Sequence, residues 1–209
     1  MVVGPESAQV GTMPTCRLLL VVLASSSFCT ASSQIRVRLY DYSGVSARTL
    51  ARAKTVASEV LEAAGVNVTW ANCPSPNCAG PAGPAVLQVR IISEEMARLG
   101  PKVSRTCMGY AILSGQFSTI AAVFYHRALD LEKGNLAGRS EILGTMLAHE
   151  IGHLLLGKAS HSTKGIMRGI WGDQDIKAIA RGRMWFTEPE ARKLVANTTA
   201  RIVAFAAVQ

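Results

Sequence analysis

Hydrophobic and polar residues alternate where the regular patterning of the chain begins. Between residues 34 and 42, Ile35, Val37 and Leu39 fall on one face and charged residues on the other. This period of two predicts a half-buried β-strand. From residue 46 to 64 the apolar residues instead recur every three or four positions, which predicts an amphipathic helix with Ser46 as its N-cap.

Four further apolar segments are short enough to be strands. Turn-forming residues bound them, and they span residues 66–70, 85–92, 108–113 and 119–127. The segment 93–105 predicts a short helix or a loop, and residues 129–138 predict a connection. Together with the first strand, these segments predict one five-stranded sheet.

Two helices are predicted after the strands. The first begins near residue 139 and ends before Gly157. The second begins at Thr187, which forms a capping-box pattern with Glu190, and continues to about residue 206. The stretch 158–183 holds four glycines and is predicted to be irregular. This order of elements indicates an α+β (α/β-like) fold around one sheet.

The amino terminus has the pattern of a leader. Arg17 precedes an apolar run at residues 18–24, and small residues follow it. This order is typical of a secretory signal peptide, so we expect residues 1–31 to be removed and Met13 to be the true initiator. The domain 32–209 would then be secreted, either to a periplasm or outside the cell. A buried strand or helix is the alternative, since the run is too short to span a bilayer.

Cysteine spacing fits the same expectation of export. Removing the leader would leave three of the five cysteines. Cys73 and Cys78 flank a short proline-containing segment and are candidates for a disulfide in an oxidising compartment. A zinc site is the rival interpretation, but no second pair of ligands lies nearby. Cys107 is then either a buried thiol or an alternative partner.

The net charge adds little to the functional picture. The chain has 22 lysines and arginines against 14 acidic residues, which gives a formal charge of +8. These basic residues are scattered, without interleaved aromatics or zinc-finger spacing, so nucleic-acid binding is not predicted. A solvated basic surface is the simpler explanation. No pattern in the sequence indicates an oligomeric state.

The strongest chemical pattern is the pentapeptide His149-Glu150-Ile151-Gly152-His153, an H-E-x-x-H motif. On a helix, the two histidines project from one face, one turn apart, and can bind the same Zn²⁺. Glu150 can then act as general base toward a zinc-activated water that attacks a polarised carbonyl. An ordinary buried helix with satisfied histidines is the alternative.

A third ligand is expected beyond the end of this helix. Gly157 lies four residues after His153, and His161 lies four residues after Gly157. In an unbroken helix, His161 would lie roughly 12 Å further along the axis and out of reach. Because glycine readily takes the left-handed conformation that ends helices, Gly157 lets the chain reverse and bring His161 back.

The segment from His149 to Met167 resembles the metzincin zinc peptidases, and within them the matrixin and adamalysin-like branch. That family shows H-E-x-x-H-x-x-G-x-x-H followed by a Met-turn. Here three residues, rather than two, separate His153 from Gly157 and Gly157 from His161. Ser162 after the third histidine and the Gly-Ile-Met sequence at 165–167 also match.

The resemblance implies a metzincin-like single catalytic domain. It would have a twisted mixed sheet, a long backing helix, a zinc helix, a Met-turn and a C-terminal helix. It implies His149, His153 and His161 as zinc ligands and Met167 as an apolar floor beneath them. An antiparallel edge strand would bind extended substrate, and by position its residues are Gly109, Tyr110, Ala111 and Ile112. The expected activity is that of a zinc endopeptidase acting on peptides or proteins.

Two alternatives remain open at this stage. In a gluzincin-like peptidase the third ligand would be a later carboxylate, with Glu188 and Glu190 as first candidates and Asp173 and Asp175 as weaker ones. The chain could instead be an exported protein that binds zinc or another ligand without catalysis. No propeptide cysteine motif of the matrixin type is visible.

Overall fold

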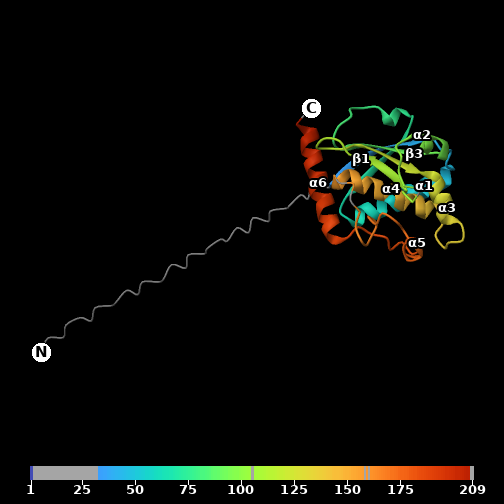
Figure 1. Ribbon diagram of the computed structural model, residues 1–209. Helices are drawn as coiled ribbons and strands as arrows, with labels where there is room; N and C mark the ends of the chain where they lie inside the picture. Colours follow the sequence, from blue (N-terminus) through green and yellow to red (C-terminus); the bar gives the residue numbers. More distant parts are fainter. Residues whose placement is uncertain (2–32, 105, 158, 160, 208–209) are drawn as a thin grey trace. The chain divides into compact units, whose positions relative to one another are not determined.

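The computed structural model describes residue 1 and residues 33–104, 106–157, 159 and 161–207 (Figure 1). Apart from residue 1, the predicted leader and the proposed initiator Met13 lie outside these described residues. No described helix combines the length and apolarity needed to cross a membrane.

Five strands form one mixed sheet in the order β2-β1-β3-β5-β4. Their bounds are β1 (Gln34–Asp41), β2 (Asn67–Cys73), β3 (Val86–Ile92), β4 (Gly109–Ile112) and β5 (Ile120–Phe124). Strands β2, β1, β3 and β5 run parallel to one another, and β4 pairs antiparallel with β5, with Gly109 opposite Val123. The prediction of a five-stranded mixed sheet is confirmed, and β4 lies at its edge.

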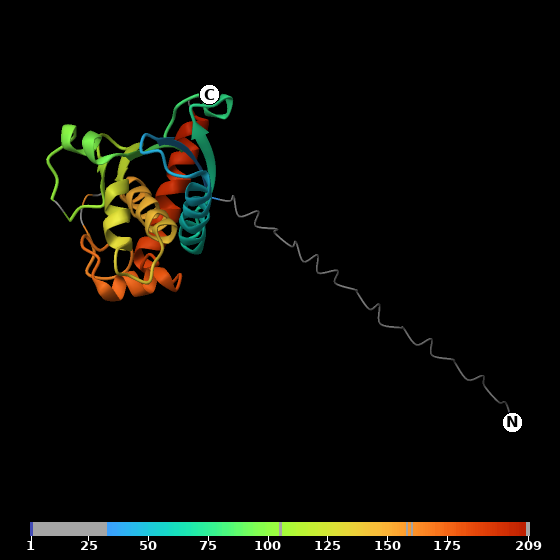
Figure 2. The ribbon, with the colours of Figure 1, turned by 90° about the vertical axis from the view of Figure 1, so that its right-hand side faces the viewer.

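Helices flank this sheet on both faces. They are α1 (Ala47–Ala63), α2 (Glu94–Leu99), α3 (Tyr125–Glu132), α4 (Arg139–Leu156), α5 (Asp173–Ala180) and α6 (Glu188–Ala206), with a 3₁₀ turn η1 (Pro76–Cys78). Helices α1 and α4 pack against the same face and share the main core with it (Figure 2). Every residue of α4 from Ile142 to Leu156 is buried, so this helix forms the centre of the molecule.

The short helix α2 lies over the other face of the sheet. A second, smaller apolar cluster forms there from Ile92, Ala122 and Phe124, with Ala97 of α2 packed against it. Ser93 caps α2 by accepting a hydrogen bond from the backbone N–H of Met96 at 3.3 Å. The segment 93–105 therefore contains the short helix that was one of its two predicted forms.

Two predictions of local structure were wrong. The strand predicted at 119–127 ends at Phe124, and its last residues begin α3, whose buried Ala128 joins the main core. The segment 158–183, predicted to be irregular, contains α5. The Asp175 carboxylate caps α5 by accepting a hydrogen bond from the backbone N–H of Gly172 at 2.9 Å. This cap was not predicted from the short polar sequence.

The disulfide between Cys73 and Cys78 is present and closes the loop that follows β2. Its two Cα atoms lie 5.8 Å apart, within the usual range for disulfides. Cys107 is a free, half-buried thiol. The paired and unpaired cysteines thus agree with the first of the predicted arrangements.

Candidate metal centre

The two histidines of the H-E-x-x-H motif lie on one face of α4, and both are buried. His149 and His153 are 2% and 4% exposed, and their rings meet edge to face with centroids 4.7 Å apart. Their Nε2 atoms approach to 3.1 Å. The spacing of four residues on a helix thus places both ligand atoms at one point, as predicted.

The orientation of His149 is fixed by the loop that follows α4. Its Nδ1 lies 2.7 Å from the carbonyl oxygen of Ile166. Because a carbonyl only accepts, Nδ1 carries the proton and Nε2 presents a lone pair. The indole N–H of Trp171 donates to the same carbonyl at 3.3 Å, and its ring meets His149 edge to face. Such a partner on the far ring nitrogen is typical of metal-binding histidines.

The chain reverses after α4 as the sequence predicts. Gly157 takes the left-handed conformation, with φ of 65°, and its N–H donates to the carbonyl of His153. His161 returns to the site, where its Nε2 lies 3.2 Å from that of His153. Its ring lies against the backbone of Gly169, where a Cβ would come within 2.8 Å of Nδ1. The longer spacing within the motif does not keep His161 away.

The three histidines form the group in the described residues that fits a metal ion. Their ligand atoms all lie within 4.8 Å of one another. Nitrogens at tetrahedral positions around zinc, each about 2.0–2.1 Å away, are roughly 3.3 Å apart, and the two Nε2 separations here are 3.1 and 3.2 Å. A cation at their centre would bind the three nitrogens in place of these contacts between rings. This donor set supports Zn²⁺ as the ion.

The rings are held in the form that binds a metal. Burial, followed by the charge of His153, lowers the pKa of His149 to about 3. Burial also lowers the pKa of His161. Both rings are therefore neutral at neutral pH, and neutral imidazole is the ligand form.

Glu150 lies beside this group and under the edge strand. It is 2% exposed, and among the described residues its Oε2 has no hydrogen-bond partner. A Cβ added at Gly109 would come within 2.8 Å of Glu150 Oε1, so the carboxyl group lies directly against the backbone of β4. Without a metal, burial raises the pKa of Glu150 to about 8.

A cavity of about 230 Å³ opens over these side chains. Gly109, Tyr110 and Ala111 of β4 line it together with the three histidines and Glu150, whereas Ile112 is outside the lining and 47% exposed. Three of the four residues predicted to bind substrate therefore border the site. Their contact with a substrate stays a prediction. The free thiol of Cys107 also lines this cavity.

Met167 is fully buried against the metal-binding turn of α4. A Cβ at Gly152 would lie 2.8 Å from its sulfur and 2.7 Å from the ring of Phe186. The Met167 carbonyl accepts from the backbone N–H of Ser162 at 2.8 Å, which closes the loop after His161. Met167 therefore packs against α4 at Gly152, which lies between His149 and His153 in the sequence, and this agrees with the predicted apolar floor.

Three of the four carboxylates considered as alternative ligands are engaged elsewhere, and the fourth, Asp173, lies outside the ligand group. Glu190 accepts from the hydroxyl of Ser162 and from the backbone N–H of Thr187. Glu188 pairs with Arg192, and Asp175 pairs with Arg168. The geometry thus brings His161, and not a carboxylate of α5 or α6, to the other two histidines.

Sequence reasoning did not find the contacts that shape this site. Gly109, Gly152 and Gly169 each let a backbone approach Glu150, Met167 or His161 more closely than a side chain would allow. One signal was present, because glycine inside a helix costs about 1 kcal/mol relative to alanine. A glycine between two ligands therefore indicates a packing requirement.

Comparisons with known proteins show the fold. No family model matches the chain, and no curated protein matches it. Among solved structures, a zinc-dependent peptidase from Methanocorpusculum labreanum superposes with a TM-score of 0.52 at 17% identity, over 76% of this chain and 99% of that one. Archaemetzincin from Methanopyrus kandleri gives a TM-score of 0.48 at 16% identity, over 81% and 98% of the two chains.

The first of these similarities shows that this mixed α/β architecture also occurs in a zinc-dependent peptidase. That similarity does not distinguish between branches of such peptidases. The branch expected from the motif therefore stays a prediction, while a fold that also occurs in a zinc-dependent peptidase is consistent with the three-histidine group.

Proposed function

We propose that this chain is an exported, metzincin-like zinc endopeptidase. One observation supports this most strongly: three histidine Nε2 atoms and the Glu150 carboxyl face one cavity beside the sheet edge. The donor set fits zinc, and the buried carboxyl group of Glu150 lines the same cavity, in which a peptide bond could bind.

The histidines and Glu150 would have different roles in hydrolysis. Zinc held by His149, His153 and His161 would supply Lewis acidity, which polarises a peptide carbonyl and acidifies water. Glu150 would take a proton from the attacking water at its free Oε2 and pass it to the departing amine. The positive charge of the ion would lower the pKa of Glu150 from its metal-free value and so favour the ionised base.

The edge strand supports cleavage within a peptide. Strand β4 pairs with β5 on one side only, so its other side can pair with an extended peptide. Because Gly109 at the start of β4 lies against Glu150, such a peptide would pass over the site rather than end in it. Export rests on the predicted leader and is consistent with the Cys73–Cys78 disulfide.

Metal content and peptide cleavage test this function together. The purified protein should hold one zinc ion per chain and cleave members of a broad peptide library, and a chelator should abolish cleavage until zinc is restored. His161→Ala should lose zinc. His126→Ala is the matched control for metal content, since His126 is the remaining histidine and lies outside the ligand group.

Other results would favour the alternatives. Zinc retained in His161→Ala but lost in Glu190→Ala would favour a gluzincin-like ligand set. One tightly bound zinc ion without cleavage of any peptide would indicate a non-catalytic zinc-binding protein.

A further inference from the structure

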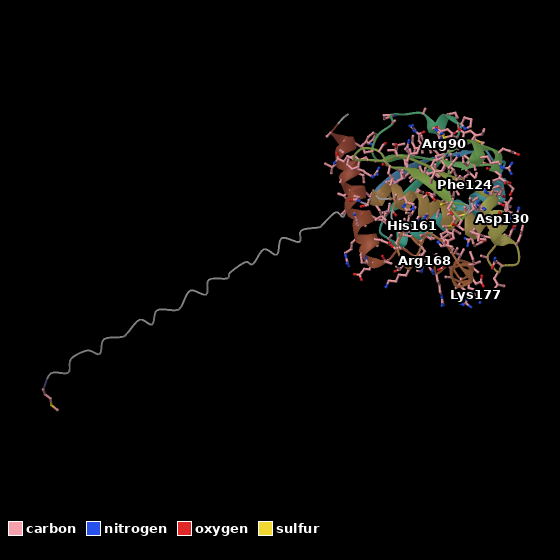
Figure 3. All side chains as sticks on the ribbon, in the orientation of Figure 1. Arg90, Phe124, Asp130, His161, Arg168 and Lys177 are labelled. Atoms are coloured by element: carbon pink, nitrogen blue, oxygen red, sulfur yellow. A yellow bond between two sulfur atoms is a disulfide. The ribbon has the colours of Figure 1, made fainter. Side chains whose placement is uncertain are left out.

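A larger cavity lies next to the histidine site, and we call it the basic cavity. Its volume is about 740 Å³, and it lies between α2, the loop 100–104 and the first turns of α3. Val103 lines both this cavity and the one above the histidines, so the two cavities are adjacent. Figure 3 labels Phe124 and Asp130, which line the basic cavity, and His161 of the metal site.

The basic cavity lies beyond the start of the edge strand. Gly109 of β4 is opposite Val123 of β5, and the next residues of the chain after Val123 include Phe124 and His126, which line the cavity. The ring of Phe124 packs against Tyr110 at 5.9 Å and against His126 at 5.8 Å. A peptide lying along β4 would therefore enter the basic cavity past the Gly109 end.

Cations exceed carboxylates in the lining of this cavity. The lining has two acidic side chains, Glu94 and Asp130. It has four cationic ones, which are Arg98, Lys102, Arg127 and Lys133. Glu94 already pairs with Arg98 at 2.7 Å, and Asp130 is shared by Lys133 at 3.0 Å and Arg127 at 3.9 Å. Within the described part of the chain, Lys102 has no carboxylate oxygen close enough for an ion pair.

This excess of positive charge does not come from histidine. Burial, followed by the charge of Arg127, lowers the pKa of His126, so its ring is neutral at neutral pH. The lining thus carries a net charge of +2, counted as four cations less two carboxylates. A cavity with this charge attracts an anionic group and disfavours a cationic one.

We propose that the basic cavity is a substrate subsite for an acidic side chain of the peptide. This inference rests on the proposed peptidase function and names its substrate class. A peptide paired antiparallel with β4 runs toward the basic cavity in its own C-terminal direction, because the cavity lies at the amino-terminal end of β4. The recognised aspartate or glutamate is therefore C-terminal to the cleaved bond.

Paired peptides test the subsite. Each pair is identical except for glutamate or glutamine at one position C-terminal to the cleaved bond, and kcat/KM is measured for wild type, Lys102→Glu and Lys177→Glu. Lys177 is an exposed cation of α5 outside the cavity lining, so its reversal matches the change in net charge. An exposed ion pair of this kind changes binding by roughly 1.4- to fivefold.

We expect wild type and Lys177→Glu to prefer the glutamate peptide roughly two- to fivefold, and Lys102→Glu to lose or invert that preference. Raising the salt concentration should shrink the preference, because solvent-exposed charges are screened. Equal cleavage of both peptides by the wild type, or a preference that survives in Lys102→Glu, would overturn the subsite while leaving the peptidase function intact. Failure of the wild type to cleave any peptide would instead count against the peptidase function on which the subsite rests.

Discussion

Individual side chains at this site are oriented by backbone groups. The Ile166 carbonyl fixes the tautomer of His149, and the backbone of Gly169 supports the ring of His161. The backbone of Gly109 lies against Glu150. The ligand types and their helical spacing could be predicted from sequence, because the chemistry of zinc restricts them. The supporting contacts could not, because they join residues that only the tertiary fold brings together.

Replacing Glu150 with glutamine should change how stability depends on pH. In the metal-free folded protein this carboxyl ionises near pH 8, against 4.5 in the unfolded chain. The raised folded-state pKa means that neutral Glu150 contributes its full stability below pH 4.5 and loses it as the pH rises to about 8. Glutamine does not titrate, so Glu150→Gln should gain stability relative to wild type over this range.

Urea unfolding of both proteins in the presence of a chelator, at about pH 5 and about pH 8.5, measures this difference. The histidines titrate in both proteins, so their contribution largely cancels in the comparison. Parallel stability curves for the two proteins would show that Glu150 ionises normally in the fold.

Gly109→Ala should destabilise the protein. The added Cβ would lie 2.2 Å from the carbonyl oxygen of Ala122 and 2.8 Å from Glu150 Oε1, so backbone must move. A cost of about 1–3 kcal/mol in the free energy of unfolding is expected for such overpacking. Gly172→Ala is the control, because no atom lies within 4 Å of its added Cβ and its φ is −96°. Equal unfolding midpoints for the two variants would argue against the close approach of β4 to Glu150.

At the scale of elements, α6 holds the end of the metal-binding helix. The last carbonyls of α4 lack partners within the helix. The side-chain amide of Asn197 donates to the Leu155 carbonyl at 2.7 Å, and the buried guanidinium of Arg201 donates to that of Leu154. Helix α6 thereby fixes the point at which the chain turns back toward His161.

Asn197→Asp should weaken this junction. Aspartate cannot donate to the Leu155 carbonyl, and its charge faces the negative end of the α4 dipole. Leaving such a carbonyl unsatisfied costs about 1–3 kcal/mol. Asn72→Asp is the matched control: Asn72 is exposed and accepts from Lys54 at 3.0 Å, so an aspartate there should be neutral or slightly stabilising. Urea midpoints of the two variants should differ in these directions, and a neutral Asn197→Asp would rule out the proposed role of α6.

Three elements were predicted from long patterns. The alternation in β1 and the helical spacing in α1 and α4 extend over eight or more residues. Helices α3 and α5 have eight residues each, only about two helical turns, and were missed. Short apolar runs are compatible with either a helix or a strand. Here α3 is favoured by packing of Ala128 in the core, and α5 by the Arg168–Asp175 pair and the cap at Gly172.

At the scale of the whole molecule, the sheet and its central helix form one framework for the site. Helix α4 carries Glu150 and two of the three clustered histidines, the loop after it carries the third histidine, and β4 borders the cavity. The resemblance to the metzincins implied this arrangement, and the predicted order of elements was consistent with it. The basic cavity was not predicted, because its charges come from α2, α3 and the loop 100–104 and are dispersed in the sequence.

The central claim is that Glu150 performs chemistry at a zinc ion held by the three histidines. Cleavage of a susceptible peptide by zinc-loaded wild type and by Glu150→Gln tests it most directly, with bound zinc measured in the same samples. Both proteins should hold one zinc ion per chain, while the variant should lose roughly 10²–10⁴-fold in kcat, the usual contribution of a general base. A variant that holds zinc and cleaves the peptide at the wild-type rate would contradict the account.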